Sequence, residues 1–455
     1  MVLILLILKE VNKIEEFHWK KLIIIFIISV LSFFIPLPVS QDAMIVFSIL
    51  ILAALLWVTE TIPLFLTSLL VTILVVLFRV FTFKDAVLKF ADPILVLFFG
   101  GFLIAKAMQD VSLDKRIAKQ IGNKVRDDKY VLLALMLFTA FLSMWISNTA
   151  TTVVMIPIAL GVVHKYKKKM TNFSKASVLG IAYSANIGGI GTILGSPPNA
   201  ITVSKLLEIS SIHITFFQWM KMALPLVIIL IPIAWLVLLK IFPFEDLKTS
   251  KKEKLEKLNK EQKLFLGVFL VTILLWITTS FHGLSSSLIA LMSATFLFII
   301  RLLRLSDLNK INYQILILFG GGLVLGSALF SSGLSKFFAE SMANLLQNYS
   351  VFIVILGVAV FSVVLGALAS NTATAAILIP VIIPLAAILN FSTSTLALIS
   401  GIAVSLDFLL PVGTPPNAIA YSTGKVSIKD MLRAGIILTV ISIIVLSLVA
   451  RFLWL

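Results

Sequence analysis

The sequence predicts an all-α polytopic membrane protein with about 11 transmembrane helices in two inverted repeats. Three observations lead to this fold class. Hydrophobic residues make up 60% of the 455 residues and charged residues only 13%, which exceeds the apolar share of ordinary soluble domains. Several apolar runs are longer than the 18 or so residues that cross a bilayer as a helix. Two polar motifs occur once in each half of the chain.

The positive charge of the chain indicates a membrane topology and not a nucleic-acid partner. The formal net charge is +16, but the lysines gather in short loops between apolar runs, as is typical of cytoplasmic loops. Met1–Leu8 has no basic segment before it, so we expect no signal peptide. We expect a multi-pass protein of the cytoplasmic (inner) membrane, with its amino terminus in the cytoplasm and its carboxyl terminus outside. The absence of cysteine excludes disulfides and thiolate metal sites.

Residues 1–41 are expected to form an amino-terminal lead-in and a first transmembrane helix. The first inverted repeat then covers residues 42–243. Its expected elements are spans at 43–58, 62–80, 93–109 and 217–242, a hairpin at 131–163 and a broken helix at 176–207.

The stretch 131–163 is predicted to be a re-entrant hairpin because it is long for one helix and both of its ends are basic. Lys129 precedes it, and four lysines between 165 and 169 follow it. Basic ends remain in the cytoplasm, so both ends are expected on the same side of the membrane. Two short full spans, or one tilted helix, are the alternatives.

The polar segment 244–263 is expected to be a cytoplasmic linker, and residues 264–455 the second inverted repeat. The expected elements of this repeat are spans at 264–281, 284–301, 316–336 and 432–454, a hairpin at 351–390 and a broken helix at 395–424. The second hairpin has almost no positive charge at either end, which places both ends outside. The two hairpins should therefore enter from opposite faces, the arrangement with which secondary transporters build a site at mid-membrane.

The duplicated motifs lie at the expected breaks of the hairpins and broken helices. Ser-Asn-Thr-Ala-Thr occurs at 147–151 and again at 370–374, and Pro-Pro-Asn-Ala-Ile occurs at 197–201 and at 415–419. A break in a membrane helix leaves backbone groups unpaired, and it persists only inside protein or beside a wet cavity. The hydroxyls of these motifs could instead bond back to carbonyls one turn earlier, but duplication of both motifs favours a shared binding cavity.

The charge of the motifs indicates which ligands such a cavity holds. Helix amino-terminal ends and amide donors suit an anion, whereas helix carboxyl-terminal carbonyls and hydroxyl oxygens suit small cations. Neither motif contains Lys or Arg, and a multivalent anion without a cationic partner is very unfavourable in a low dielectric. Bound cations would supply the missing charge, so the motifs predict cation-coupled anion transport.

The paired Ser-Asn-Thr motifs, each followed by Pro-Pro-Asn-Ala, resemble those of the divalent-anion:sodium symporter (DASS) family, the sodium-coupled dicarboxylate, citrate and sulfate carriers. The resemblance covers nearly the whole chain in motif order and spacing. It implies a homodimer with scaffold helices at the dimer contact, and a transport domain in each protomer that crosses the membrane as an elevator. It also implies two or more sodium ions and no organic cofactor.

The resemblance assigns site residues by motif. The residues expected to contact the anion are Ser147, Asn148, Thr149, Ser196, Pro197, Ser370, Asn371, Thr372, Thr414 and Pro415. The residues expected to bind sodium are Ser143, Ser147, Asn148 and Gly195 at one site, and Gly366, Ala369, Asn371 and Gly413 at a second. Gly366 takes the place that Ser143 holds in the first half, so the second site has one side-chain ligand fewer.

Two acids close to membrane depth remain outside these sets. Glu60 precedes Ile62 and Pro63 in a short turn and is interpreted as an interfacial residue. Asp407 lies six residues before Gly413 in the second broken helix. An ionisable residue in that place is a candidate for coupling, and a helix-end acid in a wet vestibule is the alternative.

Together these features predict a secondary active transporter that couples sodium to C4-dicarboxylates such as succinate, malate and fumarate. A tricarboxylate or sulfate symporter and a sodium-independent dicarboxylate exchanger remain the alternatives. An intramembrane enzyme would need a nucleophile with its base, or a cluster of acids, near the motifs, and the sequence has neither there. A channel would show conductance without saturable uptake.

The topology can be tested by labelling, because every cysteine introduced into this cysteine-free chain is the only one. We expect a cysteine at Asn348 to react with an impermeant thiol reagent added outside whole cells, and a cysteine at Lys168 to react only after permeabilisation. Equal accessibility of both positions would contradict the inverted repeat.

Overall fold

The computed structural model describes residues 19–113, 116, 127–164, 171–244, 257–368, 370–411 and 413–454. The predicted amino-terminal lead-in, most of the predicted linker, and the lysines that follow the first hairpin lie outside these residues. The all-α membrane architecture predicted from the sequence is confirmed, since the described ranges contain helices and connecting turns and no strand.

In the first half of the chain, the helices from α2 to α6 precede the first motif, and the two broken elements follow them. Its elements are α2 (Trp19–Ser32), α3 (Gln41–Thr59), α4 (Leu64–Leu77), α5 (Phe83–Leu88), η1 (Lys89–Ala91), α6 (Pro93–Asp110), α8 (Asp128–Ser143), α9 (Asn148–His164), α10 (Thr171–Gly189), α11 (Pro197–Ser210) and α12 (Phe216–Ile241). Local chemistry sets many of these ends. Ser40 and Thr82 accept hydrogen bonds from first-turn amides of α3 and α5, and Asp92 does the same before the proline that opens α6.

The second half repeats this order. Its elements are α13 (Lys260–Ile277), α14 (Thr279–His282), α15 (Ser286–Ile299), η2 (Leu305–Lys310), α16 (Tyr313–Ser331), α17 (Leu334–Leu346), α18 (Val351–Leu368), α19 (Asn371–Ile388), α20 (Thr393–Ala403), α21 (Pro415–Ser422), α22 (Ile428–Val449) and η3 (Ala450–Trp454). The sequence analysis did not predict α17. This helix has one polar face, so it has no apolar run long enough to suggest a span.

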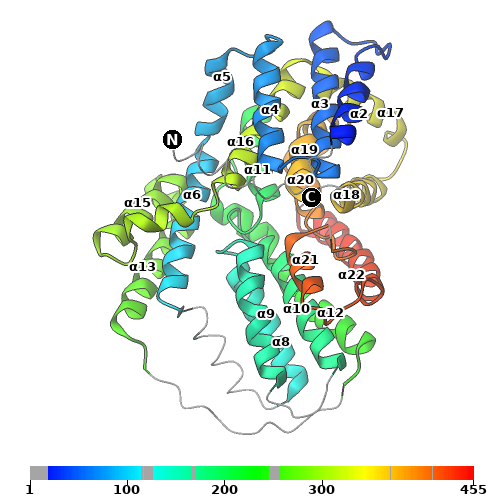
Figure 1. Ribbon diagram of the computed structural model, residues 1–455. Coiled ribbons are helices and arrows are strands. Elements are labelled where there is room, and N and C mark those ends of the chain that lie inside the picture. Colours follow the sequence, from blue (N-terminus) through cyan, green and yellow to red (C-terminus); the bar gives the residue numbers. More distant parts are fainter. Residues whose placement is uncertain are drawn as a thin grey trace.

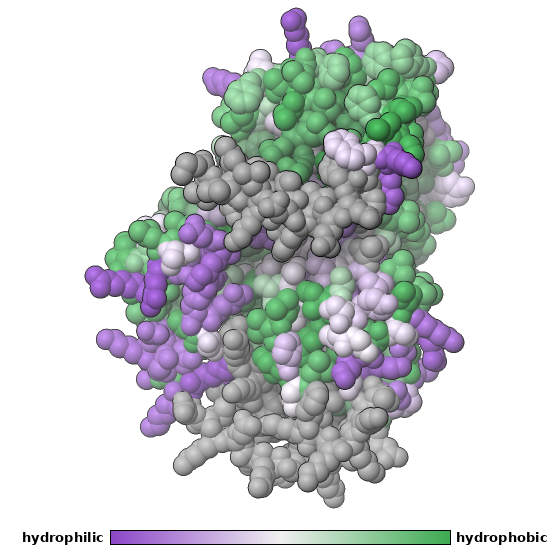
Figure 2. Space-filling model, in the orientation of Figure 1, coloured by the Kyte–Doolittle hydropathy of each residue, from purple (hydrophilic) through white to green (hydrophobic). Residues whose placement is uncertain are grey.

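Within the described ranges, seven helices are long and apolar enough to cross a membrane, and five shorter apolar helices accompany them. The figure of about 11 spans therefore stays a prediction. Large apolar side chains such as Leu77, Phe83 and Ile299 are exposed. Figure 2 shows a broad hydrophobic surface over the end of the molecule where α4 and α5 lie. Such a surface would associate in water, and lipid covers it in a membrane.

The helices of the two halves pack against each other and do not form separate bundles. Helix α16 of the second half packs along α4 of the first, and likewise α15 along α6, α19 along α11 and α22 along α12. In Figure 1, α2–α5 and α17 lie at one end of the molecule, and α8, α9, α10 and α12 lie at the other. Helices α11, α19 and α20 lie between these groups, so the motifs are placed in the interior.

A buried ion cluster joins α11 to α16. The Lys205 side chain is fully buried, and its Nζ donates to Glu208 at 2.6 Å, to the Leu323 carbonyl at 2.7 Å and to Ser327 at 2.8 Å. Glu208 also accepts from Lys89 at 2.7 Å. A buried charge is tolerated only with such partners, because desolvation costs several kcal/mol for each ion.

We expect Lys205→Met to lower the free energy of unfolding by about 3 kcal/mol, because it leaves Glu208 and a buried carbonyl without their lysine. The apparent melting temperature of the detergent-purified protein measures this change. Lys336→Met is the matched control, since Lys336 and Glu340 are both exposed, 3.8 Å apart, and exposed pairs contribute little. Equal shifts in the two variants would contradict the assigned role of the buried cluster.

Candidate functional site

Four helix breaks meet inside the protein, two from each half of the chain. The first hairpin breaks between α8 and α9, and the first broken helix between α10 and α11. The second hairpin breaks between α18 and α19, and the second broken helix between α20 and α21. The packing is crossed, because α9 contacts α21 of the other half and α19 contacts α11. Each Ser-Asn-Thr helix therefore lies against the opposite Pro-Pro-Asn helix.

The breaks line one cavity of about 470 Å³. Every residue predicted to contact the anion lies in its wall, namely Ser147, Asn148, Thr149, Ser196, Pro197, Ser370, Asn371, Thr372, Thr414 and Pro415. Of the residues predicted to bind sodium, Gly195 and Gly413 also line the cavity. Ser143 and Gly366 are buried behind the two tips, and Ala369 lies outside the described residues. The structure thus brings the predicted residues together, and their roles remain proposals.

Hydroxyl residues cap the helices that begin at this cavity. Ser147 accepts from the Ala150 amide at 3.3 Å, and Ser370 accepts from the Ala373 amide at 3.2 Å. Thr414 accepts from the Asn417 amide at 3.3 Å. An amino-terminal cap satisfies one of the unpaired first-turn amides and fixes where the helix starts. The serine hydroxyls of the two tips are therefore caps, whereas Thr152, directly after the first motif, donates to the Asn148 carbonyl one turn earlier.

The two kinds of motif offer different donors to a ligand. At the tips, the first intrahelical bonds are those from Thr151 to the Ser147 carbonyl and from Thr374 to the Ser370 carbonyl. The amides of the two Asn-Thr pairs, Asn148 with Thr149 and Asn371 with Thr372, therefore precede the helical ladder and can bind an anion. The Pro-Pro pairs have no N–H at the first two helical positions. Anion donors thus come from the Ser-Asn-Thr tips.

The helix dipoles at the cavity nearly cancel. Helices α9, α11, α19 and α21 begin at the breaks, and each beginning carries roughly +0.5 elementary charge. Helices α8, α10, α18 and α20 end at the same breaks, and each end carries roughly −0.5. Among the described lining residues, Glu60 is the one charged side chain, and it is an acid. A bound dianion would therefore need cations as its counter-charge.

The end of the Asn148 side chain lies in a cluster of oxygens. Ser143 Oγ is 2.6 Å from Asn148 Oδ1 and 2.8 Å from the Ala185 carbonyl. With the amide turned by 180°, Asn148 Nδ2 lies 3.0 Å from the Gly195 carbonyl and 3.1 Å from the Ala185 carbonyl. These oxygens repel one another unless an N–H group or a cation lies between them. Carbonyl, hydroxyl and amide oxygens are ligands of hard cations, so this cluster fits the first predicted sodium site.

The second half lacks the matching hydroxyl. Asn371 Oδ1 is buried and has no hydrogen-bond partner among the described residues. A Cβ added to Gly366 would lie 3.3 Å from this oxygen and 2.9 Å from the Val404 carbonyl. The two tips are therefore alike in backbone and unlike in their side-chain oxygens.

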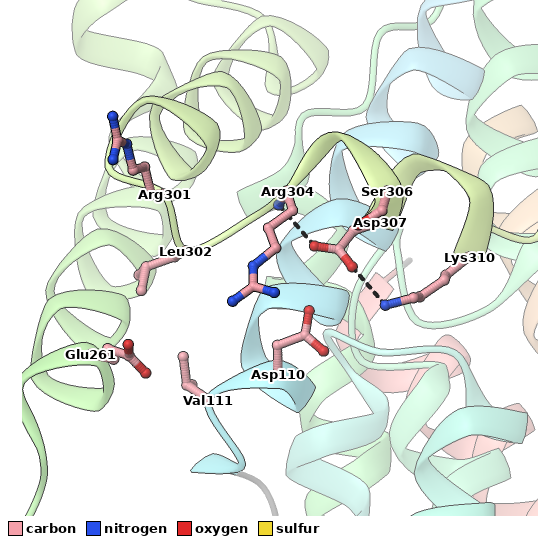
Figure 3. A pocket seen from close by; sticks show the side chains of 9 residues that line it. All are labelled: Asp110, Val111, Glu261, Arg301, Leu302, Arg304, Ser306, Asp307 and Lys310. Carbon is pink, nitrogen blue, oxygen red and sulfur yellow. Dashed lines mark hydrogen bonds and ion pairs between the residues drawn. The ribbon is translucent and has the colours of Figure 1, made fainter.

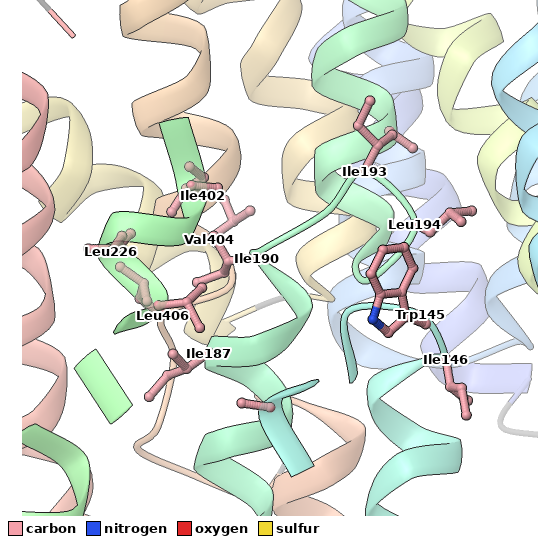
Figure 4. Packing of buried hydrophobic residues seen from close by; sticks show 14 of the residues in the cluster. Trp145, Ile146, Ile187, Ile190, Ile193, Leu194, Leu226, Ile402, Val404 and Leu406 are labelled. Atoms are coloured by element: carbon pink, nitrogen blue, oxygen red, sulfur yellow. The ribbon is translucent and has the colours of Figure 1, made fainter. Parts of the chain in front are cut away.

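Direct bonds join the two broken helices at the cavity wall. Asn186 Nδ2 donates to Thr414 Oγ1 at 3.0 Å, and the hydroxyls of Ser196 and Ser405 are 3.3 Å apart. Figure 4 shows the apolar packing around the first break, with Ile402, Val404 and Leu406 of the second break in the same cluster. This packing excludes water from the back of the site.

The first tip has an aromatic support that the second lacks. Trp145 stacks on Trp276 of α13 with ring centroids 5.9 Å apart, and Trp276 stacks on Phe216 at 4.5 Å. Figure 4 shows Trp145 beside Ile146 at the break. The residue at the same offset in the second hairpin is Leu368, which is 61% exposed. The first tip is thus fixed to neighbouring helices more firmly than the second.

Sequence reasoning missed several residues of the wall. Glu60, expected to be interfacial, lies in the cavity wall together with Phe98, Phe102 and Asn186. Glu60 also has a left-handed backbone with φ of 46°, which is uncommon for a residue other than glycine. No sequence signal links these residues to the motifs, because α3, α6 and α10 approach the tips only through tertiary packing.

A second cavity of about 300 Å³ lies at the end of α6 against η2. Figure 3 shows Asp307 of this cavity bonded to Lys310 and to the backbone of Arg304. Asp307 accepts from Lys310 at 2.8 Å and from the Arg304 amide at 2.8 Å. The hydrogen bond from Lys310 holds the pKa of Asp307 below its ordinary value. This cavity is therefore an ion-paired loop and not the counterpart of the duplicated motifs.

Comparison with known proteins identifies the family. The sequence model of the protein family "Sodium:sulfate symporter transmembrane region" matches residues 15–455. The chain belongs to the divalent-anion:sodium symporter family. As a member of that family it is a membrane transporter and not an enzyme, as the sequence predicted.

Related proteins of this family cover almost the whole chain. An "uncharacterized transporter" of Haemophilus influenzae is 37% identical over 95% of this chain and 97% of its own length. A "sodium-dependent dicarboxylate transporter SdcS" of Staphylococcus saprophyticus is 33% identical over 94% of this chain and 89% of its own.

A solved structure shows a similar fold at lower identity. The transporter MtrF of Neisseria gonorrhoeae has a TM-score of 0.59 at 11% identity, covering 95% of this chain and 93% of its own. At this identity the likeness concerns the fold alone.

A substitution at Gly189 tests whether the oxygen cluster around Asn148 binds sodium in this symporter. A Cβ at this position would lie 2.3 Å from Asn148 Oδ1, so Gly189→Ala must displace the Asn148 amide. We expect the variant to lose most of the rise in melting temperature that sodium produces in the parent protein. Gly161→Ala is the control, because a Cβ there has nothing within 4 Å. An unchanged sodium response in Gly189→Ala would contradict a cation site at Asn148.

Proposed function

We propose that this protein is a sodium-coupled symporter of C4-dicarboxylates. The observation that carries the proposal is the charge balance of the cavity. Helix dipoles nearly cancel there, and Glu60 is the one charged side chain among its described lining residues. A dianion bound at such a place needs cations, and the oxygen cluster around Asn148 is suited to hold one.

The two tips support a substrate with two carboxylates. Each tip presents one pair of amides at a helix beginning, and the two pairs come from opposite halves of the chain. A dicarboxylate could place one carboxylate on the amide pair of each tip. The volume of about 470 Å³ lies within the range of about 300 to 1,000 Å³ that is usual for small ligands. The dicarboxylate transporter named among the relatives supports the same substrate class.

Sodium ions beside Asn148 and beside Asn371 would lower the energy of the dianion inside the membrane. Two unit charges 4 Å apart attract by about 4 kcal/mol at an effective dielectric constant of 20. Two sodium ions balance a dianion, and a third would make transport electrogenic, adding about 2.3 kcal/mol for each net charge per 100 mV. The proposal includes a homodimer, elevator movement of the unit that carries the four breaks, a cytoplasmic amino terminus and an external carboxyl terminus.

Uptake into proteoliposomes tests the function. We expect an inward sodium gradient to drive accumulation of labelled succinate into vesicles that contain no dicarboxylate, whereas an equal potassium gradient should not. Asn148→Ala and Asn371→Ala should each reduce initial uptake by more than about tenfold, which corresponds to about 1.4 kcal/mol. Asn348→Ala, an exposed asparagine outside the cavity, should transport at the parental rate.

Two outcomes would redirect the proposal. Uptake that requires internal dicarboxylate and ignores sodium would indicate an exchanger. Sodium-driven uptake of citrate or sulfate in place of succinate would keep the coupling and change the substrate.

A further inference from the structure

Each broken helix is closed by an equivalent pair of hydrogen bonds, and these bonds show which residues of the two halves correspond. Asn199 Nδ2 donates to the carbonyls of Gly189 at 2.9 Å and Thr192 at 2.7 Å. Asn417 Nδ2 donates to the carbonyls of Asp407 at 3.4 Å and Leu410 at 3.1 Å. The acceptors lie ten and seven residues before the asparagine in both halves. Asp407 is therefore the structural counterpart of Gly189.

In the first half, Gly189 faces the oxygen cluster around Asn148. A Cβ on Gly189 would lie 2.3 Å from Asn148 Oδ1 and 2.8 Å from Asn148 Nδ2. The first half thus leaves no room for a side chain beside its asparagine. In the second half the same backbone position carries a carboxylate.

The Asp407 carboxylate is buried and only half satisfied. The residue has no exposed surface. Its Oδ1 accepts from the Leu409 amide at 3.0 Å, but its Oδ2 has no hydrogen-bond partner among the described residues. A Cβ on Gly413 would lie 1.7 Å from that Oδ2, so the oxygen lies directly against the loop that bounds the cavity.

Among the described residues of the second hairpin and the second broken helix, Asp407 and Asn371 contribute the two buried side-chain oxygens without a partner. Asn371 Oδ1 is also buried without a partner, and Gly366 places the Val404 carbonyl beside it. A buried carboxylate oxygen without a partner is unfavourable by several kcal/mol. Because Gly189 faces Asn148 in the first half, the correspondence of the halves directs Asp407 toward Asn371. A cation between the two side chains would satisfy both oxygens.

We propose that Asp407 is an ionic ligand of the second cation site, so that this site carries a fixed negative charge and the first does not. The inference rests on the proposed sodium coupling. The carboxylate replaces the hydroxyl that Gly366 lacks, and a charged ligand binds a cation more strongly than a neutral one. The second site therefore binds sodium more tightly than the first.

Asp407→Asn separates this role from a structural one. The amide oxygen of asparagine can still accept from the Leu409 amide, so the local turn is kept while the charge is removed. Melting temperatures are measured against sodium chloride, with choline chloride holding the ionic strength constant. In choline alone we expect Asp407→Asn to melt higher than the parent, because an uncompensated buried charge is gone. We expect the sodium concentration for half of the stabilisation to rise by about tenfold or more.

Asp307→Asn is the matched control, since Asp307 is buried against Lys310 and away from the motif cavity. It should change the melting temperature equally in sodium and in choline. If Asp407→Asn does not purify, Asp407→Ser serves instead, because its hydroxyl can also accept from the Leu409 amide.

A sodium response in the parent that Asp407→Asn leaves unchanged would overturn the inference and leave the proposed function standing. An equal loss of stability in both buffers would also overturn it, because it would show a structural role. A parent protein with no sodium response would overturn the proposed coupling and the inference together.

Discussion

Eight helix ends meet inside this protein, and their backbone groups must be satisfied away from bulk water. Each unpaired group in hydrocarbon costs several kcal/mol, so the breaks exist only because other parts of the chain supply partners. Asn199 and Asn417 each bond two loop carbonyls, and Ser147, Ser370 and Thr414 cap the helices that follow. The duplicated motifs are thus first a solution to a backbone problem. The cavity is the space that this solution leaves.

The same constraint gives the cavity polar groups of both kinds, which suit the anion and the cations of the proposed transport. Each break joins a helix that ends to a helix that begins, so carbonyls and amides lie close together. Prolines at the starts of α11 and α21 remove amide donors, and the loops before them retain their carbonyls. Amides for an anion therefore come from the tips, and oxygens for cations come from the hairpins and loops. Coupling between anion and cation follows from this proximity.

The two halves share a backbone plan but differ in the side chains around it. Trp145 fixes the first tip through a stack on Trp276, whereas the equivalent Leu368 is largely exposed. Lys205 connects α11 to α16 through a buried ion cluster. The equivalent helix of the second half, α21, is shorter and ends before the position that corresponds to Lys205. Ser143 and Gly189 in one half correspond to Gly366 and Asp407 in the other. With such differences, the two cation sites proposed beside the substrate would have unequal surroundings.

The sequence alone determined the fold class, the places of the breaks and the residues of both tips. Hydropathy and motif duplication are local signals, and every residue they selected for the anion lies in the cavity wall. Only the tertiary structure decided which segments meet there. The position of Glu60 and Phe98 in the wall, the burial of Lys205 and the correspondence of Asp407 with Gly189 depend on contacts between distant helices. No local pattern encodes such contacts, because the register of one helix against another is set by side-chain packing and by the bonds that close each break.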